Sequence, residues 1–219
     1  MKKYFFLLFS FFFVSTLLAQ QCPPFWNDIV SFKQKDSAQF PAKNAILLIG
    51  SSSFTKWTDV QDYFPGYNII NRGFGGSTLK DVIRYSYDVL LPYQPKQVII
   101  YCGENDLASS SNVQATDVVQ RFKTLYAMIR QNLPNVVIDY VSMKPSPSRK
   151  HLFPKMKEAN KQIKAFLQKD KKAGFINVYD AMLDATGNPK KEIFLEDQLH
   201  MNASGYAIWK KILLPYLMK

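Results

Sequence analysis

The chain has 219 residues, of which 28 are lysine or arginine and 17 are aspartate or glutamate, so its formal net charge is +11. A basic excess of this size is typical of proteins that bind nucleic acid or anionic surfaces. Here, however, the lysines are scattered over predicted helices without an aromatic-interleaved nucleic-acid motif, so we interpret them as a solvated basic face and expect no nucleic-acid partner. The two cysteines, Cys22 and Cys102, are too few for a disulfide framework. Cys102 reads as a buried apolar residue, and the sequence leaves the pairing of the two open.

The first twenty residues have the layout of a secretory signal peptide, with Lys2 and Lys3 followed by an apolar stretch from Tyr4 to Leu18. The stretch is shorter than the roughly 20 residues that a membrane-spanning helix needs. We therefore predict that residues 1–20 are a signal peptide that is cleaved off. The mature protein is expected to be exported, periplasmic or extracellular, with no stable membrane insertion. Lipoprotein anchoring at Cys22 is a minor alternative, because a small residue is expected where Gln21 stands.

Residues 21–219 are predicted to form one domain in which strands and helices alternate. Short apolar runs rich in β-branched residues predict five strands buried on both faces, at Ala45–Ile49, Tyr67–Ile70, Gln97–Cys102, Val136–Val141 and Phe175–Tyr179. Helical spacing of apolar residues predicts helices at Asp117–Gln131, Lys155–Lys169 and Ala203–Leu214. Pro134 and Gly174 are expected to end the first two. This is the pattern of an α/β fold with right-handed crossovers, in which ligands bind at the carboxyl ends of the strands.

Glycine is concentrated where the first three predicted strands end. Five of the nine glycines lie in the stretches Gly50–Ser53, Asn71–Thr78 and Gly103–Ala108. Glycine lets the backbone turn towards a ligand and lets the ligand approach closely, although tight turns alone also recruit it. These three loops are therefore candidates for a site, and the three consecutive serines after Gly50 are candidate nucleophiles.

Histidine is rare in this chain, and one of its two copies follows an acid at a spacing that suits catalysis. His200 lies three residues after Asp197, before a predicted helix, and residues i and i+3 of one helical turn are neighbours. A carboxylate there can orient one imidazole nitrogen and leave the other free as a base. A helix-capping aspartate beside an incidental histidine is the alternative for an isolated pair, and no second histidine or acidic cluster offers metal-ligand spacing. His151 has no nearby acid and receives no role.

Taken together, these blocks resemble the SGNH, or GDSL-type, serine esterases and acylhydrolases. The resemblance spans Gly50 to His200: Gly50-Ser51-Ser52-Ser53 aligns with the Gly-Asp-Ser-Leu block, Gly76 with the family glycine, Gly103-Glu104-Asn105-Asp106 with Gly-x-Asn-Asp, and Asp197 and His200 with Asp-x-x-His. Ser51 stands where the family has aspartate and Ser53 where it has leucine. The family fold is a flavodoxin-like three-layer α/β/α sandwich with a five-stranded parallel sheet, which agrees with the pattern of strands and helices.

The resemblance implies a mechanism and a site. It implies Ser52, Asp197 and His200 as catalytic residues, and an oxyanion hole made of the Ser52 and Gly76 backbone N–H groups and the Asn105 side chain. No cofactor and no metal are expected. The expected partner is a small-molecule or glycan ester, and the oligomeric state is left open.

The substrate is predicted less directly, as a short acyl ester, acetyl first, of a carbohydrate or small polar carrier. The loop Ser142–Arg149 is expected to form a rigid polar rim, and Trp57 and Phe74 are candidate substrate walls for which core packing is an equal alternative. A lysophospholipase or lipid acylhydrolase is the main alternative. A non-catalytic glycan- or lipid-binding protein is another, against which the four marker residues argue. A flavodoxin-like nucleotide binder would use Gly73–Thr78 as a phosphate cradle, but the chain has no Walker lysine pattern and no GxGxxG motif.

Overall fold

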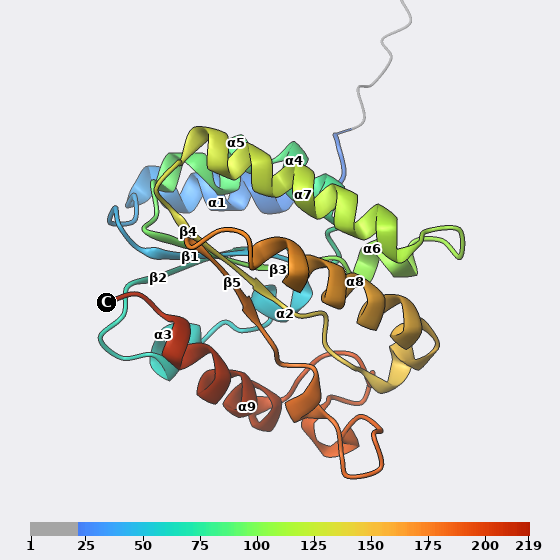
Figure 1. The fold of residues 1–219 in the computed structure, drawn as a ribbon. Coiled ribbons are helices and arrows are strands. Elements are labelled where there is room, and N and C mark those ends of the chain that lie inside the picture. The colour runs from blue at the N-terminus through green and yellow to red at the C-terminus, as the bar shows by residue number, and fades with distance from the viewer. Residues whose placement is uncertain (1–21) are drawn as a thin grey trace, which may run out of the picture.

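The computed structural model describes residues 22–219, and the predicted signal segment lies outside the described residues. At its centre is a five-stranded parallel sheet in the order β2-β1-β3-β4-β5 (Figure 1). The strands are β1 (Ile46–Gly50), β2 (Ile69–Gly73), β3 (Gln97–Tyr101), β4 (Val137–Val141) and β5 (Ala173–Ile176). The order confirms the predicted parallel α/β architecture.

Helices cover both faces of the sheet (Figure 1). One face packs against α1 (Trp26–Ala38), α4 (Leu79–Arg84), α5 (Ser86–Val89), α7 (Ala115–Asn132) and α8 (Phe153–Leu167). The other face packs against α2 (Ser52–Thr55), α3 (Val60–Tyr63) and α9 (Ala203–Leu213). The short α6 (Glu104–Ala108) follows β3, and 3₁₀ turns occupy η1 (Leu91–Tyr93), η2 (Pro147–Leu152), η3 (Asp180–Met182), η4 (Lys191–Ile193) and η5 (Leu214–Tyr216).

The central strand β1 is apolar throughout because it contributes to two cores. In β1, Leu47 and Ile49 join the core under α1, α4 and α7, whereas Ile46 and Leu48 join the core under α2 and α9. All five residues of β1 are buried, and so are all five of β3. Alternation between two covered faces therefore gives a continuous apolar run rather than an apolar–polar alternation.

The sheet order fixes where a ligand can enter. Strand β1 lies between β2 and β3, so the winding of the chain reverses at this point, and a crevice at the carboxyl ends of the strands is expected there. Gly50 pairs in register with Gly73 of β2 and Tyr101 of β3, so the three strands end level with one another. The loops that follow these strands consequently meet at one edge of the sheet.

Two sequence-based boundaries near the end of the sheet are wrong. Helix α8 ends at Leu167, well before Gly174, which lies inside β5 rather than ending the helix. A Cβ atom at Gly174 would lie 2.0 Å from Oδ1 of the buried Asp139, so glycine lets β5 pack against that carboxyl group. The strand then stops after Ile176 instead of reaching Tyr179, because the side chain of Asn177 accepts the Tyr179 N–H and turns the chain.

Candidate active site

Gly50 makes the sharp turn from β1 into α2. Its φ is +130°, and a Cβ atom there would lie 1.9 Å from the Tyr101 carbonyl oxygen, so only glycine fits. The next N–H, of Ser51, donates to that same carbonyl oxygen at 3.0 Å. The Gly50 carbonyl oxygen in turn accepts the Phe74 N–H at 2.9 Å and the Ser77 hydroxyl at 3.1 Å. One glycine therefore joins the loops that follow β1, β2 and β3.

The middle serine of the three is the one that faces the histidine. Ser51 and Ser53 are buried, with 3% and 1% of their surface exposed, whereas Ser52 is only half-buried. The Oγ of Ser52 lies 2.9 Å from Nε2 of His200. Ser52 is also the first residue of α2, so its backbone N–H has no helical acceptor.

Asp197 and His200 lie in a turn of their own and not in a helix. Oδ1 of Asp197 accepts the N–H groups of Leu199 and His200, both at 2.9 Å, and Oδ2 lies 2.5 Å from Nδ1 of the His200 ring. Gln198 between them adopts φ +54°, and α9 begins only at Ala203, with Asn202 as its cap. The expected proximity is present, but an aspartate-centred turn produces it instead of a helical turn.

The hydrogen bonds to Asp197 set its charge. Burial alone would raise the pKa of this carboxyl group, but the N–H groups of His200 and Leu199 and the His200 ring together hold the pKa well below its usual range. The group therefore stays a carboxylate and accepts from Nδ1 of the ring. With Nδ1 as the donor, Nε2 is the nitrogen that can accept a proton from Ser52.

Two further donors face the same edge of the sheet. Gly76 has φ +86°, and its N–H has no protein acceptor among the described residues. Nδ2 of Asn105, in the first turn of α6, donates one hydrogen to the Ser77 carbonyl oxygen at 3.1 Å. An amide nitrogen carries two hydrogens, so this bond orients the group and leaves the second hydrogen free.

Asp106 connects the segments that carry Asn105 and Gly76, a role that was not predicted from the sequence. Its Oδ2 accepts the N–H of Leu79, the first residue of α4, at 2.9 Å, and its Oδ1 accepts from Arg121 at 2.7 Å. The residue is fully buried, and this burial raises the pKa of its carboxyl group even though Arg121 and Leu79 oppose the shift. Asp106 thus ties the Asn105 segment to the start of the helix that follows Gly76.

A buried ion pair beside Asn105 was also missed. Oε2 of Glu104 lies 3.1 Å from Nζ of Lys144 and accepts the Tyr101 hydroxyl at 2.6 Å. The Lys144 side chain is only 2% exposed and that of Glu104 only 5%. Glu104 stands in the Gly103–Asp106 block, but nothing in the sequence around it indicates that its partner is a lysine 40 positions later.

Several expectations about the surroundings of the site need correction. The loop Ser142–Arg149 is not a polar rim throughout, because Ser142 to Ser146 are buried and Lys144 turns inwards to Glu104. Only its end reaches the site, where the Ser148 N–H donates to the Gln198 carbonyl oxygen at 3.1 Å. Trp57 and Phe74 are fully buried and belong to the core, so neither is a substrate wall. His151 is exposed in η2.

The two cysteines do not pair. Cys22 is exposed, whereas Cys102 is fully buried, as predicted, and burial raises the pKa of its thiol. In the described part of the chain, no helix is both long and apolar enough to cross a membrane. Residues 22–219 also contain no group of three or more histidine, cysteine, aspartate or glutamate side chains arranged to hold a metal ion.

The geometry thus combines a serine, a histidine and an aspartate in a hydrogen-bonded series with free N–H donors beside them, at the switch point of a parallel sheet. A family model confirms the class: the GDSL-like lipase/acylhydrolase family matches residues 49–208. The chain belongs to this family of hydrolases. No protein with a curated description matches it in sequence.

Solved structures support the fold. A protein from Streptococcus pneumonia assigned as a platelet activating factor superposes with a TM-score of 0.76 at 20% identity, covering 88% of this chain and 92% of its own. A protein from Bacteroides fragilis assigned as an acylhydrolase gives 0.74 at 20% identity, with 87% and 96% covered. An acetylxylan esterase from Geobacillus stearothermophilus gives 0.62 at 14% identity, with 80% and 94% covered. At these identities the likeness establishes the five-stranded fold, and not a shared substrate.

Proposed function

We propose that this protein is an exported serine ester hydrolase that cleaves short acyl esters, acetyl first, of a carbohydrate or small polar carrier. The observation that supports this most directly is the pair of contacts made by the His200 ring. Its Nε2 lies 2.9 Å from the Ser52 hydroxyl, and its Nδ1 lies 2.5 Å from the Asp197 carboxylate. Nucleophile, base and orienting acid are thus in mutual hydrogen-bond reach, as acyl transfer requires.

The reaction proceeds through an acyl-enzyme. Oγ of Ser52 attacks the ester carbonyl carbon while Nε2 of His200 takes its proton, and the same nitrogen then protonates the departing alcohol. A water molecule, deprotonated by His200, attacks the acyl group on Ser52, and the carboxylic acid leaves as the serine regains its proton. Asp197 keeps the ring in the tautomer that accepts at Nε2 and stabilises its charged form.

The oxyanion that develops on the carbonyl oxygen needs donors that are already in place. The Ser52 N–H, the Gly76 N–H and the free hydrogen of the Asn105 amide meet this need, because none of the three is used by a protein acceptor among the described residues. Each such donor contributes about 3–4 kcal/mol to lowering the barrier. Gly76 suits the position because its φ of +86° is a conformation that glycine adopts without strain.

The fold and the sequence suggest the acyl group and its carrier. The fold neighbour from Geobacillus stearothermophilus is an acetylxylan esterase, which makes acetylated carbohydrate the first class to test. The apolar segment at residues 4–18 favours an extracytoplasmic location, where such esters occur.

The test uses p-nitrophenyl esters from acetate to laurate, with the mature protein, Ser52→Ala and the matched control Ser51→Ala. We expect turnover that is highest for acetate, falls beyond butyrate, is lost in Ser52→Ala and is retained in Ser51→Ala. A serine-directed phosphonate should label the protein, and mass spectrometry should place the label on Ser52. Turnover that survives Ser52→Ala would refute the assignment, and a preference for laurate would favour a lipid acylhydrolase.

A further inference from the structure

The positive charge of this protein is confined to one part of the chain. Residues 142–219 hold 15 lysines and arginines against 7 aspartates and glutamates, a net charge of +8. Residues 22–141 hold 11 against 10, a net charge of +1. Lysines that served only solubility would be spread evenly along the chain. The excess of positive charge in residues 142–219 therefore indicates that an anionic ligand binds to this part.

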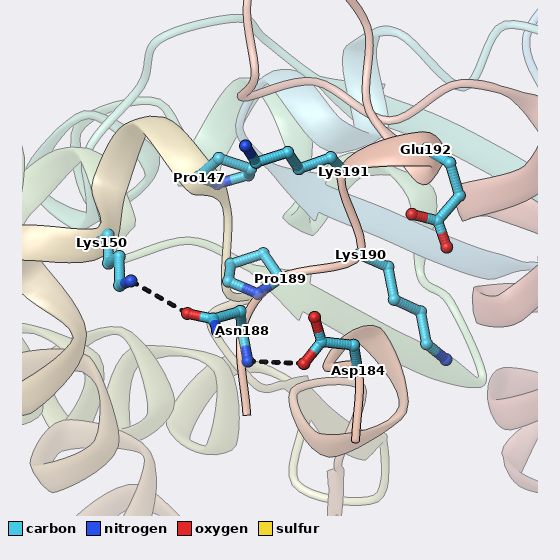
Figure 2. Close-up of a pocket in the computed structure, with 8 residues that line it drawn as sticks. All are labelled: Pro147, Lys150, Asp184, Asn188, Pro189, Lys190, Lys191 and Glu192. Carbon is cyan, nitrogen blue, oxygen red and sulfur yellow. Dashed lines mark hydrogen bonds between the residues drawn. The ribbon is translucent and has the colours of Figure 1, made fainter. Parts of the chain in front are cut away.

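The first depression in that part lies between η2 and the segment Asp184–Glu192. It has a volume of about 720 Å³, within the usual range for ligand pockets, and Lys150, Lys190 and Lys191 line it. Lys150 donates to the Asn188 side chain at 2.9 Å, and Lys190 donates to the Ala181 carbonyl oxygen at 3.0 Å. Figure 2 shows Lys191 reaching across the depression towards Pro147. The acceptors of Lys150 and Lys190 are neutral, so neither bond cancels the charge of its ammonium group.

A second, smaller depression is also lined by residues of this C-terminal part. It has a volume of about 150 Å³ and lies between α8 and the chain that leaves β5. Lys157, Lys161 and Lys164 line it from one face of the helix, at positions i, i+4 and i+7. Consecutive segments of the chain line the two depressions, because η2 runs directly into α8 and η3 connects Tyr179 to the segment 184–192.

Tyr179 adds an unused donor to the second depression. It is 5% exposed, and its hydroxyl has no hydrogen-bond partner among the described residues. Burial, and then the nearby Asp180, raise the pKa of Tyr179 to about 12, so the hydroxyl stays protonated and can donate. The Lys157 ammonium lies 5.7 Å from the centre of its ring.

We call the six lysines Lys150, Lys157, Lys161, Lys164, Lys190 and Lys191 the basic track. Within residues 22–219, none of them forms an ion pair with a carboxylate. Three carboxylates share the lining of the two depressions: Asp184 and Glu192 in the first and Asp180 in the second. Asp184 is used by its own turn, where Oδ1 accepts the N–H groups of Thr186 and Asn188 and the Thr186 hydroxyl. Six lysines thus face three carboxylates, and the track keeps a net positive charge.

The track leads to the catalytic turn. Pro147 lines the first depression, and the next residue, Ser148, donates its N–H to the Gln198 carbonyl oxygen beside Asp197. On the other flank, Glu192 lines the depression while its carbonyl oxygen accepts the Asn202 side chain two residues after His200. The depression borders the catalytic turn without containing Ser52, so a ligand that occupies both must extend beyond its ester group.

We propose that the basic track binds the chain of an acidic polysaccharide, with its carboxylate groups on the lysines, and so presents the acyl esters of that chain to Ser52. This inference rests on the proposed esterase function and narrows its substrate class. Repeated carboxylates along one polymer match lysines spread over two depressions, and an extended polymer spans the separation between the track and the nucleophile. Electrostatic attraction of this kind raises the rate of encounter and weakens with salt.

The test compares acetylated polygalacturonate with acetylated dextran of the same acetyl content, and uses p-nitrophenyl acetate as a neutral small ester. We expect kcat/KM to be higher for the acidic polymer and to fall between about 50 and about 300 mM NaCl, with no such fall for the small ester. In the triple variant Lys150→Gln, Lys190→Gln, Lys191→Gln, we expect a loss of about fivefold or more on the acidic polymer only.

The matched control is Lys35→Gln, Lys43→Gln, Lys80→Gln, which removes the same charge from exposed lysines outside the track. Equal losses of kcat/KM in both triple variants, or equal kcat/KM on the two polymers, would overturn the inference. The esterase function would still hold if the protein hydrolysed p-nitrophenyl acetate. No turnover of any ester would overturn the esterase function instead. In that case, binding of the Ser52→Ala variant to polygalacturonate tests the track separately. Binding that the track substitutions weaken would support the inference, and binding that they leave unchanged would overturn it. Tighter track-dependent binding to duplex DNA or anionic vesicles would assign the track to another partner and also overturn the inference.

Discussion

The buried pair of Glu104 and Lys144 allows a quantitative prediction about stability. Both charges are almost fully removed from solvent, and each depends on the other and on the Tyr101 hydroxyl for its hydrogen bonds. Lys144→Met leaves the Glu104 carboxylate with Tyr101 and with Arg149, whose Nε lies 4.0 Å from Oε1. Removing one partner of a buried pair costs about 3–5 kcal/mol. Since domains of this kind are stable by about 5–15 kcal/mol, the loss is a large part of the total.

The double variant distinguishes a buried pair from two independent residues. In Glu104→Gln with Lys144→Met no charge is left unpaired, so we expect it to be far less destabilised than the sum of the single variants, with a coupling energy of at least about 2 kcal/mol. Urea unfolding followed by the fluorescence of the buried Trp57 and Trp209 measures all three. Lys43→Met, at an exposed lysine, should change stability by no more than about 0.5 kcal/mol. Single losses below about 1 kcal/mol that add in the double variant would refute the reasoning.

Three further predictions concern the site and the sheet. Asp197→Asn should lower kcat by about 10²-fold or more, yet by less than His200→Ala, because it misorients the base without removing it; unchanged kinetics would remove Asp197 from the mechanism. Asn105→Ala should lower kcat about 10²- to 10³-fold with little change in KM, and an effect confined to KM would argue against an oxyanion donor. Burial raises the folded-state pKa of Asp139, so relative to Asp139→Asn the wild type should lose stability as pH rises from about 4 through that raised pKa. Urea unfolding across this pH window checks the sign, and a wild type that gains stability relative to the variant would contradict it.

The strands and the sheet could be predicted because their signal is local. A run such as Ile46–Gly50 is apolar on both faces and ends in a glycine, and neither property depends on the rest of the chain. Helix α1 escaped prediction because it is held by distant partners: Asp36 pairs with Arg72, and Pro24, just before the helix, accepts from the Tyr85 hydroxyl. Gly174 was misread for a similar reason, because what requires a glycine there is the carboxyl group of Asp139 on the neighbouring strand.

The candidate site was predictable to the extent that its residues stand in recognisable blocks. Ser52, Asn105 and His200 could be placed in this way, and the structure brings the serine and the histidine together. The inward turn of Lys144 could not be predicted, since a lysine between prolines and serines is typical of an exposed loop. Its burial follows from Glu104, which no pattern in the sequence links to it.

The turn that holds Asp197 and His200 is closed by its own backbone. The Leu195 N–H donates to the His200 carbonyl oxygen at 2.7 Å, and Phe194 forms an antiparallel bridge with Met201. The orientation of the imidazole is therefore fixed within eight residues, 194–201. The neighbouring segment 184–190 forms no hydrogen bond with residues 194–201. Its length and composition can therefore vary while that turn stays closed, so the choice of substrate can evolve separately from the chemistry.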